Sequence, residues 1–523
     1  MEASYIVGPG MPKPSSLDRM VSSRLTNAMR WLAGIPSKQQ SISSTTDYFS
    51  DHAVDTDHTT DHSDSDTVEA LPVAGWGPAA FMHRDGLEEI LADPAVREVE
   101  PGYDLQELVR ELAAGSRDAN PFYVVNLSTI MEKVYAWERE LPRIRPFYAV
   151  KCNGDEKLCR MLAMAGCGFD CASKAEIEQM LALGARPADL IYANPCKQTS
   201  MLHFAKQAGV RKMTADNVEE LHKIQQVFPA ARVLIRIAVD DSQSVCRFNS
   251  KFGSPKQEWD LLMRTAKKLE LDIAGISFHV GSGCGDLKPF ADAVSTARDA
   301  FDLAESYGFK PTILDVGGGW PGSDDGNFSF SAFAAVVRDA IDHYFPAESG
   351  VEVIAEPGRY FAHASHTYAV SVIAKRQLSN AQLANTAEIE SFGAQPSKDS
   401  AHNSIIDDGF KKVEVSENTP EVALFINDGV YGSFNCVVFD HALLKPKPLT
   451  PRDDARIVAT KLFGPTCDSI DVVIPCTRLP EMHVGDWLWF AGMGAYTRCA
   501  ASRFNGQGHH DIHYIWSGMP RAS

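Results

Sequence analysis

Eight short apolar segments alternate with helical segments between residues 146 and 356, and this regularity constrains the fold more than any other feature of the sequence. Amphipathic patterns such as those of 218–227 and 330–344 fill the intervals between them. Eight such units are typical of a (β/α)8 barrel, although an open doubly wound sheet would show the same alternation. The predicted strands are 146–151, 168–172, 190–194, 212–216, 233–239, 273–280, 312–317 and 351–356.

After Gly358 the pattern changes to short strands that are separated by turns and accompanied by little helix. This composition predicts a second, all-β domain, either a sandwich or a barrel. A further strand over 122–126 is expected where the chain enters the barrel, outside the closed sheet. The strands predicted for the β domain are 368–375, 422–427, 436–439, 457–463, 471–475 and 486–490.

The fold class is therefore α/β plus all-β, with four segments along the chain. Residues 1–69 form a polar extension with seven aspartates between Asp47 and Asp66, which cannot bury enough apolar surface to fold. Its histidines have no imposed geometry, so no metal site is predicted. Residues 70–121 contribute to the β domain, 122–365 form the barrel, and 366–523 form the C-terminal β domain. Within the last segment, 376–420 is too long for an ordinary connection and is predicted to be a disordered insertion.

The formal charge of −18 argues against binding to nucleic acid or anionic membranes and is compatible with a cationic small molecule. No apolar run is long enough to cross a membrane, and Met1 does not begin a secretory signal. The eleven cysteines show no zinc-like spacing and indicate free thiols in a reducing compartment. A cytoplasmic location is expected, with a mitochondrial leader in residues 1–46 as the less favoured alternative.

One lysine ends the first strand of the alternation. The run from Phe147 to Val150 is followed by Lys151 and then by Asn153-Gly154, which breaks the strand and opens a helix. The carboxyl ends of barrel strands are where enzymes of this fold place their chemistry. Partial burial is expected to lower the pKa of the Lys151 amine, and a neutral amine can form a Schiff base. A lysine that merely extends its ammonium into solvent is the ordinary alternative.

Polar or glycine-rich residues also end the other strands of the barrel. Three glycines at 317–319 let backbone N–H groups approach an anion, although a tight turn is an equally good explanation. Glu356 could pair with a ring nitrogen, while Gly358 and Arg359 could hold a phosphate. Together these segments predict a phosphate-bearing aromatic cofactor. The strand-end set is Lys151, Asp170, Asn194, Asp216, Arg236, His279, Gly317, Gly318, Gly319 and Glu356.

Ten segments in order resemble the eukaryotic, in particular the fungal, ornithine decarboxylases. These are group IV decarboxylases that depend on pyridoxal phosphate and have an alanine-racemase-like barrel. The resemblance covers roughly residues 80–516. The segments are PFYAVKCN, FDCAS, YANPCK, SFHVGSG, DVGGG, EPGRYF, NDGVYGSFNC, FDH, GPTCDS and GAYT.

The resemblance implies a role for each residue that matches a family motif. Lys151 would be the Schiff-base lysine, Glu356 would keep the pyridine nitrogen protonated, and His279 would stack on the ring. The implied pyridoxal 5'-phosphate site consists of Lys151, Asp170, Arg236, His279, Ser282, Gly317, Gly318, Gly319, Glu356, Pro357, Gly358, Arg359 and Tyr496.

The implied reaction converts L-ornithine to putrescine and carbon dioxide, the first step of polyamine biosynthesis. Asp440, and Asp468 from a partner chain, would bind the distal ammonium. Phe439, beside Asp440, would belong to the same substrate-binding set, at a position where the best-known animal members carry tyrosine. Cys467 of the partner chain would protonate Cα, so an obligate homodimer with two shared sites is expected.

Other activities compete with this interpretation. Lysine has one methylene more than ornithine, a difference worth only ~1–3 kcal/mol of discrimination, so decarboxylation of lysine or another basic amino acid stays open. A catalytically inactive paralogue that binds antizyme is less favoured, because Lys151, Glu356 and Cys467 are all present. Antizyme is also a possible partner of an active enzyme. A racemase with a single barrel would lack the β domain.

Overall fold

The computed structural model describes residues 84–242, 244–284, 286–324, 329–378, 420–450, 452 and 454–519. The predicted extension 1–69 and most of the predicted insertion 376–420 lie outside these residues, as do the histidines of the extension.

The eight strands of the alternation close into a parallel barrel, in the order β11-β12-β3-β4-β5-β6-β7-β9. This closure confirms the barrel and rules out the open sheet. Its interior is filled by apolar side chains from several strands, among them Phe147, Leu234 and Ile354. The strands are β3 (Ile144–Ala149), β4 (Gly168–Cys171), β5 (Leu190–Tyr192), β6 (Lys212–Ala215), β7 (Arg232–Arg236), β9 (Asp272–Ser277), β11 (Ile313–Asp315) and β12 (Glu352–Ala355).

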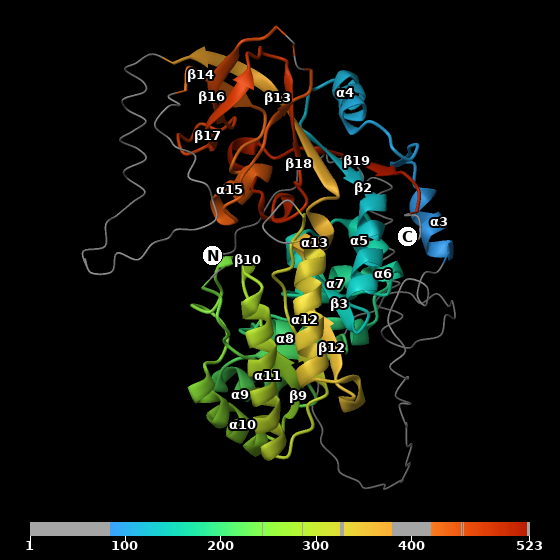
Figure 1. Ribbon diagram of the computed structural model, residues 1–523, viewed down its shortest axis with the longest axis vertical. Coiled ribbons are helices and arrows are strands. Elements are labelled where there is room, and N and C mark those ends of the chain that lie inside the picture. The colour runs from blue at the N-terminus through green and yellow to red at the C-terminus, as the bar shows by residue number, and fades with distance from the viewer. Residues whose placement is uncertain are drawn as a thin grey trace, which may run out of the picture. The chain divides into compact units, whose positions relative to one another are not determined.

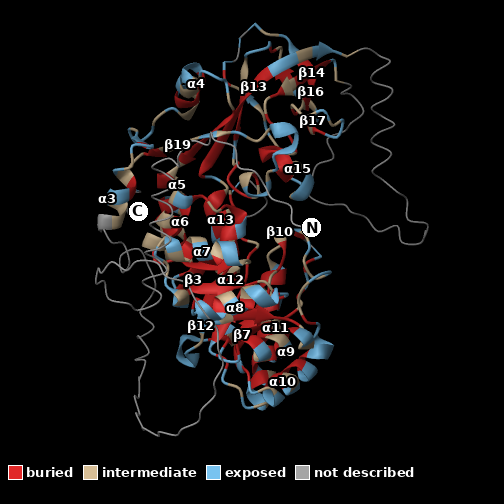
Figure 2. Cartoon of the chain, turned by 180° about the vertical axis from the view of Figure 1, so that it is seen from behind, coloured by how far each residue is buried: buried red, intermediate tan, exposed pale blue. Residues whose placement is uncertain are grey.

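Helices surround this barrel, with exposed outer faces and buried strands between them (Figure 2). Several start at a capping side chain, for example Asp155, whose carboxylate accepts the N–H groups of Lys157 and Leu158 at the start of α6. The helices are α5 (Leu127–Glu140), α6 (Glu156–Met164), α7 (Lys174–Ala182), α8 (Thr199–Gln207), α9 (Val218–Val227), α10 (Trp259–Lys268), α11 (Lys288–Ser306) and α12 (Phe330–Tyr344).

The remaining long strands form a second, mixed sheet, which confirms a separate β region. Its main path is β1-β19-β2-β13-β14-β16-β17, and β18 pairs with β13 and β15. The strands are β1 (Val96–Glu98), β2 (Phe122–Asn126), β13 (His366–Gln377), β14 (Val422–Ile426), β15 (Lys447–Pro448), β16 (Ile457–Phe463), β17 (Val472–Pro480), β18 (Trp487–Ala491) and β19 (Asp511–Trp516).

One of two predictions about strands is confirmed and the other is wrong. The strand 122–126 lies outside the closed barrel, as expected, and it belongs to the mixed sheet, where β2 pairs with β13 and β19. Its apolar pattern predicts burial and cannot specify the partner strand. The predicted strand 436–439 is instead the helical turn α15 (Cys436–Phe439), because the chain turns at Gly432 and continues through a 3-10 turn.

The segment before the barrel packs against both parts of the fold. Helix α3 (Arg84–Leu91) contacts α6 of the barrel. Helix α4 (Leu105–Gly115) buries Leu108 and Val109 against the mixed sheet, where they join a cluster with Phe122 and Trp489. The described residues 84–121 therefore contribute to the β region through β1 and α4, and to the barrel surface through α3.

Two short elements connect the barrel to the sheet. Helix α13 (Arg359–Ala362) follows β12 and leads into β13, so it lies where the two parts of the fold meet (Figure 1). The hairpin-like pair β8 (Ser244–Cys246) and β10 (Ser282–Cys284) is antiparallel and follows the barrel strands β7 and β9. These elements place Arg359 and Ser282 close to the residues of the mixed sheet.

Candidate active site

Lys151 lies in a single 3-10 turn, Val150–Cys152, directly after β3, and its ammonium forms an ion pair with Asp170 at the end of β4. The Asp170 side chain is fully buried, whereas 38% of the Lys151 side chain is exposed. Burial lowers the pKa of Lys151, but Asp170 and Glu356 outweigh it and raise the pKa above its ordinary value. The predicted lowering of this pKa is therefore wrong, because the carboxylates that surround the amine come from other strands.

Three buried carboxyl oxygens of the described barrel residues lack any hydrogen-bond donor. They are Oε1 of Glu356, which follows β12, Oδ1 of Asp170 and Oδ2 of Asp315. Burial raises the pKa of Glu356 well above its usual value. A buried acceptor without a donor is costly, so these oxygens fit a ligand that brings an N–H group. A protonated ring nitrogen is such a donor.

His279 follows β9 and is held by its neighbours. Its Nδ1 accepts the N–H of Gly281 at 2.9 Å, and its ring meets Phe248 edge to face with 4.9 Å between the ring centroids. Burial, together with the positive charges of Arg236 and Lys151, lowers the pKa of His279 well below its ordinary value. The ring is therefore neutral, and its proton lies on Nε2 because Nδ1 accepts.

The three glycines after β11 are required by close contacts rather than by a turn alone. A Cβ at Gly317 would lie 2.1 Å from the Phe278 oxygen, one at Gly318 would lie 2.6 Å from Nε2 of His279, and one at Gly319 would lie 2.6 Å from the Gly281 oxygen. Gly317 and Gly319 also have positive φ angles of 64° and 101°. Only glycine lets this loop approach His279 so closely.

A second group of residues surrounds Arg359 at the start of α13. Its Nη2 lies 3.3 Å from Oγ of Ser282, and its guanidinium lies over the Tyr496 ring at 5.2 Å. Tyr496 adopts a φ of 52°, a strained conformation for a bulky residue. Such strain is common at ligand sites. The guanidinium, the hydroxyl groups and the glycine loop are suited to a phosphate.

The residues around Gly358 explain the close packing of this turn. A Cβ at Gly358 would lie 2.8 Å from Cβ of Cys152, next to Lys151. The Pro357 oxygen accepts the N–H of Ala149 at 3.2 Å. The segment 356–359 is thereby held against the turn that carries Lys151.

A cavity of about 740 Å³ lies beside Arg359 and includes Asp440. Nη2 of Arg359 donates to both carboxylate oxygens of Asp440, at 2.6 and 2.7 Å. Sγ of Cys246 lies 3.9 Å from Oδ1 of Asp440. Phe439 points into solvent, with 70% of its surface exposed. The cavity therefore joins a cationic group from the barrel to a carboxylate from the β region.

Cys467 and Asp468 lie on the loop between β16 and β17. Cys467 is exposed, and its N–H donates to Asn505 at 3.0 Å. The Tyr431 hydroxyl donates to Asp468 at 2.5 Å, which lowers the pKa of that carboxyl. Neither Cys467 nor Asp468 is among the residues that line the 740 Å³ cavity.

The structure brings most of the predicted residues together and adds others. Arg236 ends β7, and its guanidinium lies over the Phe252 ring at 5.3 Å. Sequence reasoning missed Cys246 and Asp315; the motif DVGGG contained Asp315, but only its glycines were interpreted. Among the residues that the structure describes, no three histidine, cysteine or acidic side chains are grouped to bind a metal ion.

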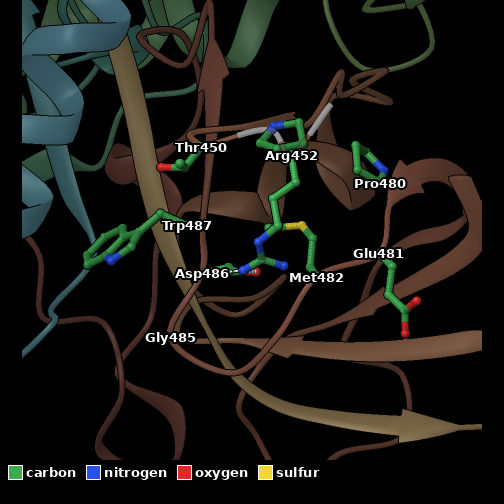
Figure 3. A pocket seen from close by; sticks show the side chains of 9 residues that line it. Thr450, Arg452, Pro480, Glu481, Met482, Gly485, Asp486 and Trp487 are labelled. Atoms are coloured by element: carbon green, nitrogen blue, oxygen red, sulfur yellow. Dashed lines mark hydrogen bonds and ion pairs between the residues drawn. The ribbon is translucent and has the colours of Figure 1, made fainter. Parts of the chain in front are cut away.

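A smaller hollow of about 90 Å³ lies in the β region (Figure 3). Arg452 there donates to Asp486 at 3.1 Å and contacts Nδ1 of His483 at 2.6 Å. None of the predicted site residues lines it. Its charged groups already have ion-pair partners, Arg452 with Asp486 and Glu481 with Lys375, so it is not the candidate site. In the described ranges, no helix is long and apolar enough to cross a membrane.

The barrel and the mixed sheet, together with the family model and the solved structures that match, place the chain in the class of barrel decarboxylases that use pyridoxal phosphate. Residues 127–363 match the family described as "Pyridoxal-dependent decarboxylase, pyridoxal binding domain". The cofactor of this protein is pyridoxal phosphate. The chain belongs to the ornithine decarboxylase family.

Individual relatives support this assignment over most of the chain. The sequence is 42% identical to antizyme inhibitor 2 of Xenopus laevis, over 81% of this chain and 87% of that protein. It is 43% identical to ornithine decarboxylase of Mus pahari, over 79% of this chain and 84% of that protein. The arginine decarboxylase of Paramecium bursaria Chlorella virus, solved with agmatine, has a TM-score of 0.68 and 33% identity, over 79% of this chain and 100% of that one.

Proposed function

We propose that this protein decarboxylates L-ornithine to putrescine and carbon dioxide. The observation that carries the proposal is the carboxylate of Asp440, which lies in the cavity beside Arg359 at 2.6 Å. Arg359 is suited to the cofactor phosphate, and Asp440 is suited to an ammonium group. Because Asp440 lies at a fixed distance from Arg359, the pair matches a substrate with a cationic tail. The curated relatives that are named ornithine decarboxylase support the same substrate.

The cofactor would be held by residues of the barrel. Lys151 would bind the aldehyde carbon, Glu356 would accept a hydrogen bond from the ring nitrogen, and neutral His279 would cover the ring face. Gly317–Gly319, with Ser282, Arg359 and Tyr496, would hold the phosphate. Bound pyridoxal phosphate supplies the electron sink for the bond that breaks at Cα.

The substrate and the final proton would be handled by the β region. Asp440 would bind the distal ammonium once Arg359 engages the phosphate. Cys467, whose thiol is exposed, would deliver a proton to Cα. Asp468 would complete the ammonium site.

Cys467 and Asp468 would reach the site from a second copy of the chain. Both lie outside the 740 Å³ cavity of their own chain, which supports a homodimer with two shared sites. Large apolar side chains are exposed on both chain segments, namely Phe439 and Leu443 near Asp440 and Ile470 near Asp468. Such side chains are suited to burial in an interface. The ten described cysteines without disulfides support a cytoplasmic location.

A second candidate function is antizyme binding without catalysis. Its support is the 42% identity to antizyme inhibitor 2. The Lys151–Asp170 ion pair and the unpartnered oxygen of Glu356 favour an active site that binds its cofactor. An active enzyme that also binds antizyme is compatible with both observations.

Turnover of ornithine, lysine and arginine by the purified protein tests the proposal. We expect putrescine as the main product and an absorption band from the lysine-bound cofactor. Protein that binds pyridoxal phosphate but prefers lysine or arginine would contradict the substrate. Protein that binds antizyme but not pyridoxal phosphate would contradict the activity.

A further inference from the structure

Asp315, the last residue of β11, is fully buried and has no part in the site proposed above. Strand β11 pairs with β12, where Asp315 lies opposite Ile354. Two residues further on, the N–H of Glu356 donates to the Gly317 oxygen at 2.8 Å. The two chain segments therefore run side by side, and the register places the side chains of Asp315 and Glu356 on the same face of adjacent segments, two residues apart.

The oxygens of this pair have few donors. Oδ1 of Asp315 accepts the N–H of Gly317 at 2.9 Å and so shapes the glycine loop. Oδ2 of Asp315 and Oε1 of Glu356 have no donor when both groups are taken as carboxylates. Two carboxylates cannot hydrogen-bond to each other without a proton, so a bond between them requires that one is protonated.

We propose that Asp315 is a positioning residue that donates a hydrogen bond to Glu356 and holds its carboxylate toward the ring nitrogen of pyridoxal phosphate. The inference rests on the proposed placement of that ring against Glu356. With the proton on Asp315, Glu356 is the anion and its free Oε1 accepts the ring N–H. If Glu356 carried the proton instead, its O–H could point at the ring N–H, and two donors would then face each other. If the O–H pointed at Asp315, Glu356 would be neutral and a weaker acceptor for the ring N–H.

The electrostatics of the site agree with a shared proton. Burial raises the pKa of Asp315 to about 7 and that of Glu356 well above its usual value. A protonated ring nitrogen beside Glu356 would favour the anion of Glu356, which leaves the proton with Asp315. The other charged or titratable groups around the pair are Asp170, Lys151, Arg236 and His279.

Two substitutions separate this role from a role in the turn. In both Asp315→Asn and Asp315→Ser, a side-chain oxygen can still accept the N–H of Gly317. Only the asparagine amide is long enough to donate to Glu356. At pH 7, we expect the Asp315→Asn apoenzyme to bind pyridoxal phosphate with a Kd within about threefold of the wild-type value. The Asp315→Ser apoenzyme should have a Kd about tenfold higher than the wild type. Equal affinity of the Ser variant and the wild type would overturn the proposal.

A double-mutant cycle on cofactor affinity supplies the decisive comparison. Glu356→Ala should weaken binding, and Asp315→Ser should cause no further loss in that background. If the two losses add in full, Asp315 acts through the turn and the inference is wrong. If Glu356→Ala leaves the affinity unchanged, the proposed site itself is wrong. Asp339→Ser, at an exposed position of α12, is the matched control.

The pH dependence gives a readout that a purely structural role would not change. The affinity of the wild-type apoenzyme for pyridoxal phosphate should fall as the pH rises, because the shared proton is lost. The amide of Asp315→Asn keeps its donor at every pH. The two proteins share all the neighbouring groups, so the difference isolates Asp315. Parallel affinity profiles from pH 6 to pH 9 would overturn the proposal.

Discussion

Arg359 donates from a single nitrogen, Nη2, to both carboxylate oxygens of Asp440, at 2.6 and 2.7 Å. The side chains are only 22% and 10% exposed, so the pair is largely shielded from water. Burial lowers the pKa of Arg359, but the charge of Asp440 outweighs it and the net shift is upward. The group proposed for the cofactor phosphate and the group proposed for the substrate ammonium therefore neutralise each other.

Substitution of Asp440 should separate substrate binding from cofactor binding. Asp440→Ala removes the carboxylate for the ammonium and frees the guanidinium of Arg359. Loss of a largely buried charged partner costs about 2–5 kcal/mol, which corresponds to a kcat/KM for ornithine at least about thirtyfold lower. Cofactor affinity of the apoenzyme should stay equal or increase. A parallel loss of both quantities, measured by steady-state kinetics and cofactor titration, would contradict separate roles.

Substitution of Lys151 tests the central residue of the site. Lys151→Ala should abolish the absorption band of the lysine-bound cofactor and reduce putrescine formation to background. The substitution also leaves the fully buried Asp170 without its ion pair, so the free energy of unfolding should fall. Lys174→Ala, at a half-exposed ion pair on α7, is the matched control and should retain the band. Retention of the band and the activity by Lys151→Ala would refute the assignment.

Mixed dimers test the shared site. Lys151→Ala and Cys467→Ala proteins should each be inactive in putrescine formation, but a heterodimer would contain one site with both wild-type residues. If the subunits exchange freely, about a quarter of the wild-type activity should return. Mass spectrometry should first show that the subunits have exchanged. If no activity returns after that exchange, Cys467 acts within its own chain or not at all.

A methyl group at Gly318 should displace His279. The Cβ of Gly318→Ala would lie 2.6 Å from Nε2 of His279, too close for the imidazole to keep its position. We expect cofactor affinity to fall about tenfold or more, with a changed absorption spectrum. Gly115→Ala is the matched control, since no atom lies within 4 Å of the added Cβ and its φ angle is ordinary. An unchanged affinity in Gly318→Ala would contradict the proposed position of the ring.

The stability of the apoenzyme should decrease with pH. Asp315 has a folded-state pKa of about 7, above the value near 3.9 of an unfolded chain, so the folded state binds more protons between these limits. The contribution of Asp315 to the free energy of unfolding is therefore fully present at low pH and is lost as the pH rises through about 7. Asp315→Asn should raise the melting temperature of the apoenzyme at pH 8 more than at pH 5. An equal shift at both values, measured by thermal unfolding, would contradict the raised pKa.

Local sequence patterns were sufficient for the scaffold and for much of the candidate site. All eight barrel strands and helices such as α9 follow from apolar periodicity, because that pattern reports which residues are buried. Polar groups at strand ends, such as Lys151 and Glu356, follow from the rule that parallel strands share one carboxyl edge. The motif resemblance then supplied roles that periodicity cannot provide.

The sequence by itself determined the eight barrel strands, the helices between them and the residues that end these strands, since these properties depend on neighbours along the chain. Tertiary structure alone decided the rest. It placed β2 in the mixed sheet, reversed the expected pKa shift of Lys151 through Asp170, and paired Arg359 with Asp440, 81 residues later. Strand partners and electrostatic fields depend on groups that are distant along the chain, and no local pattern encodes that distance.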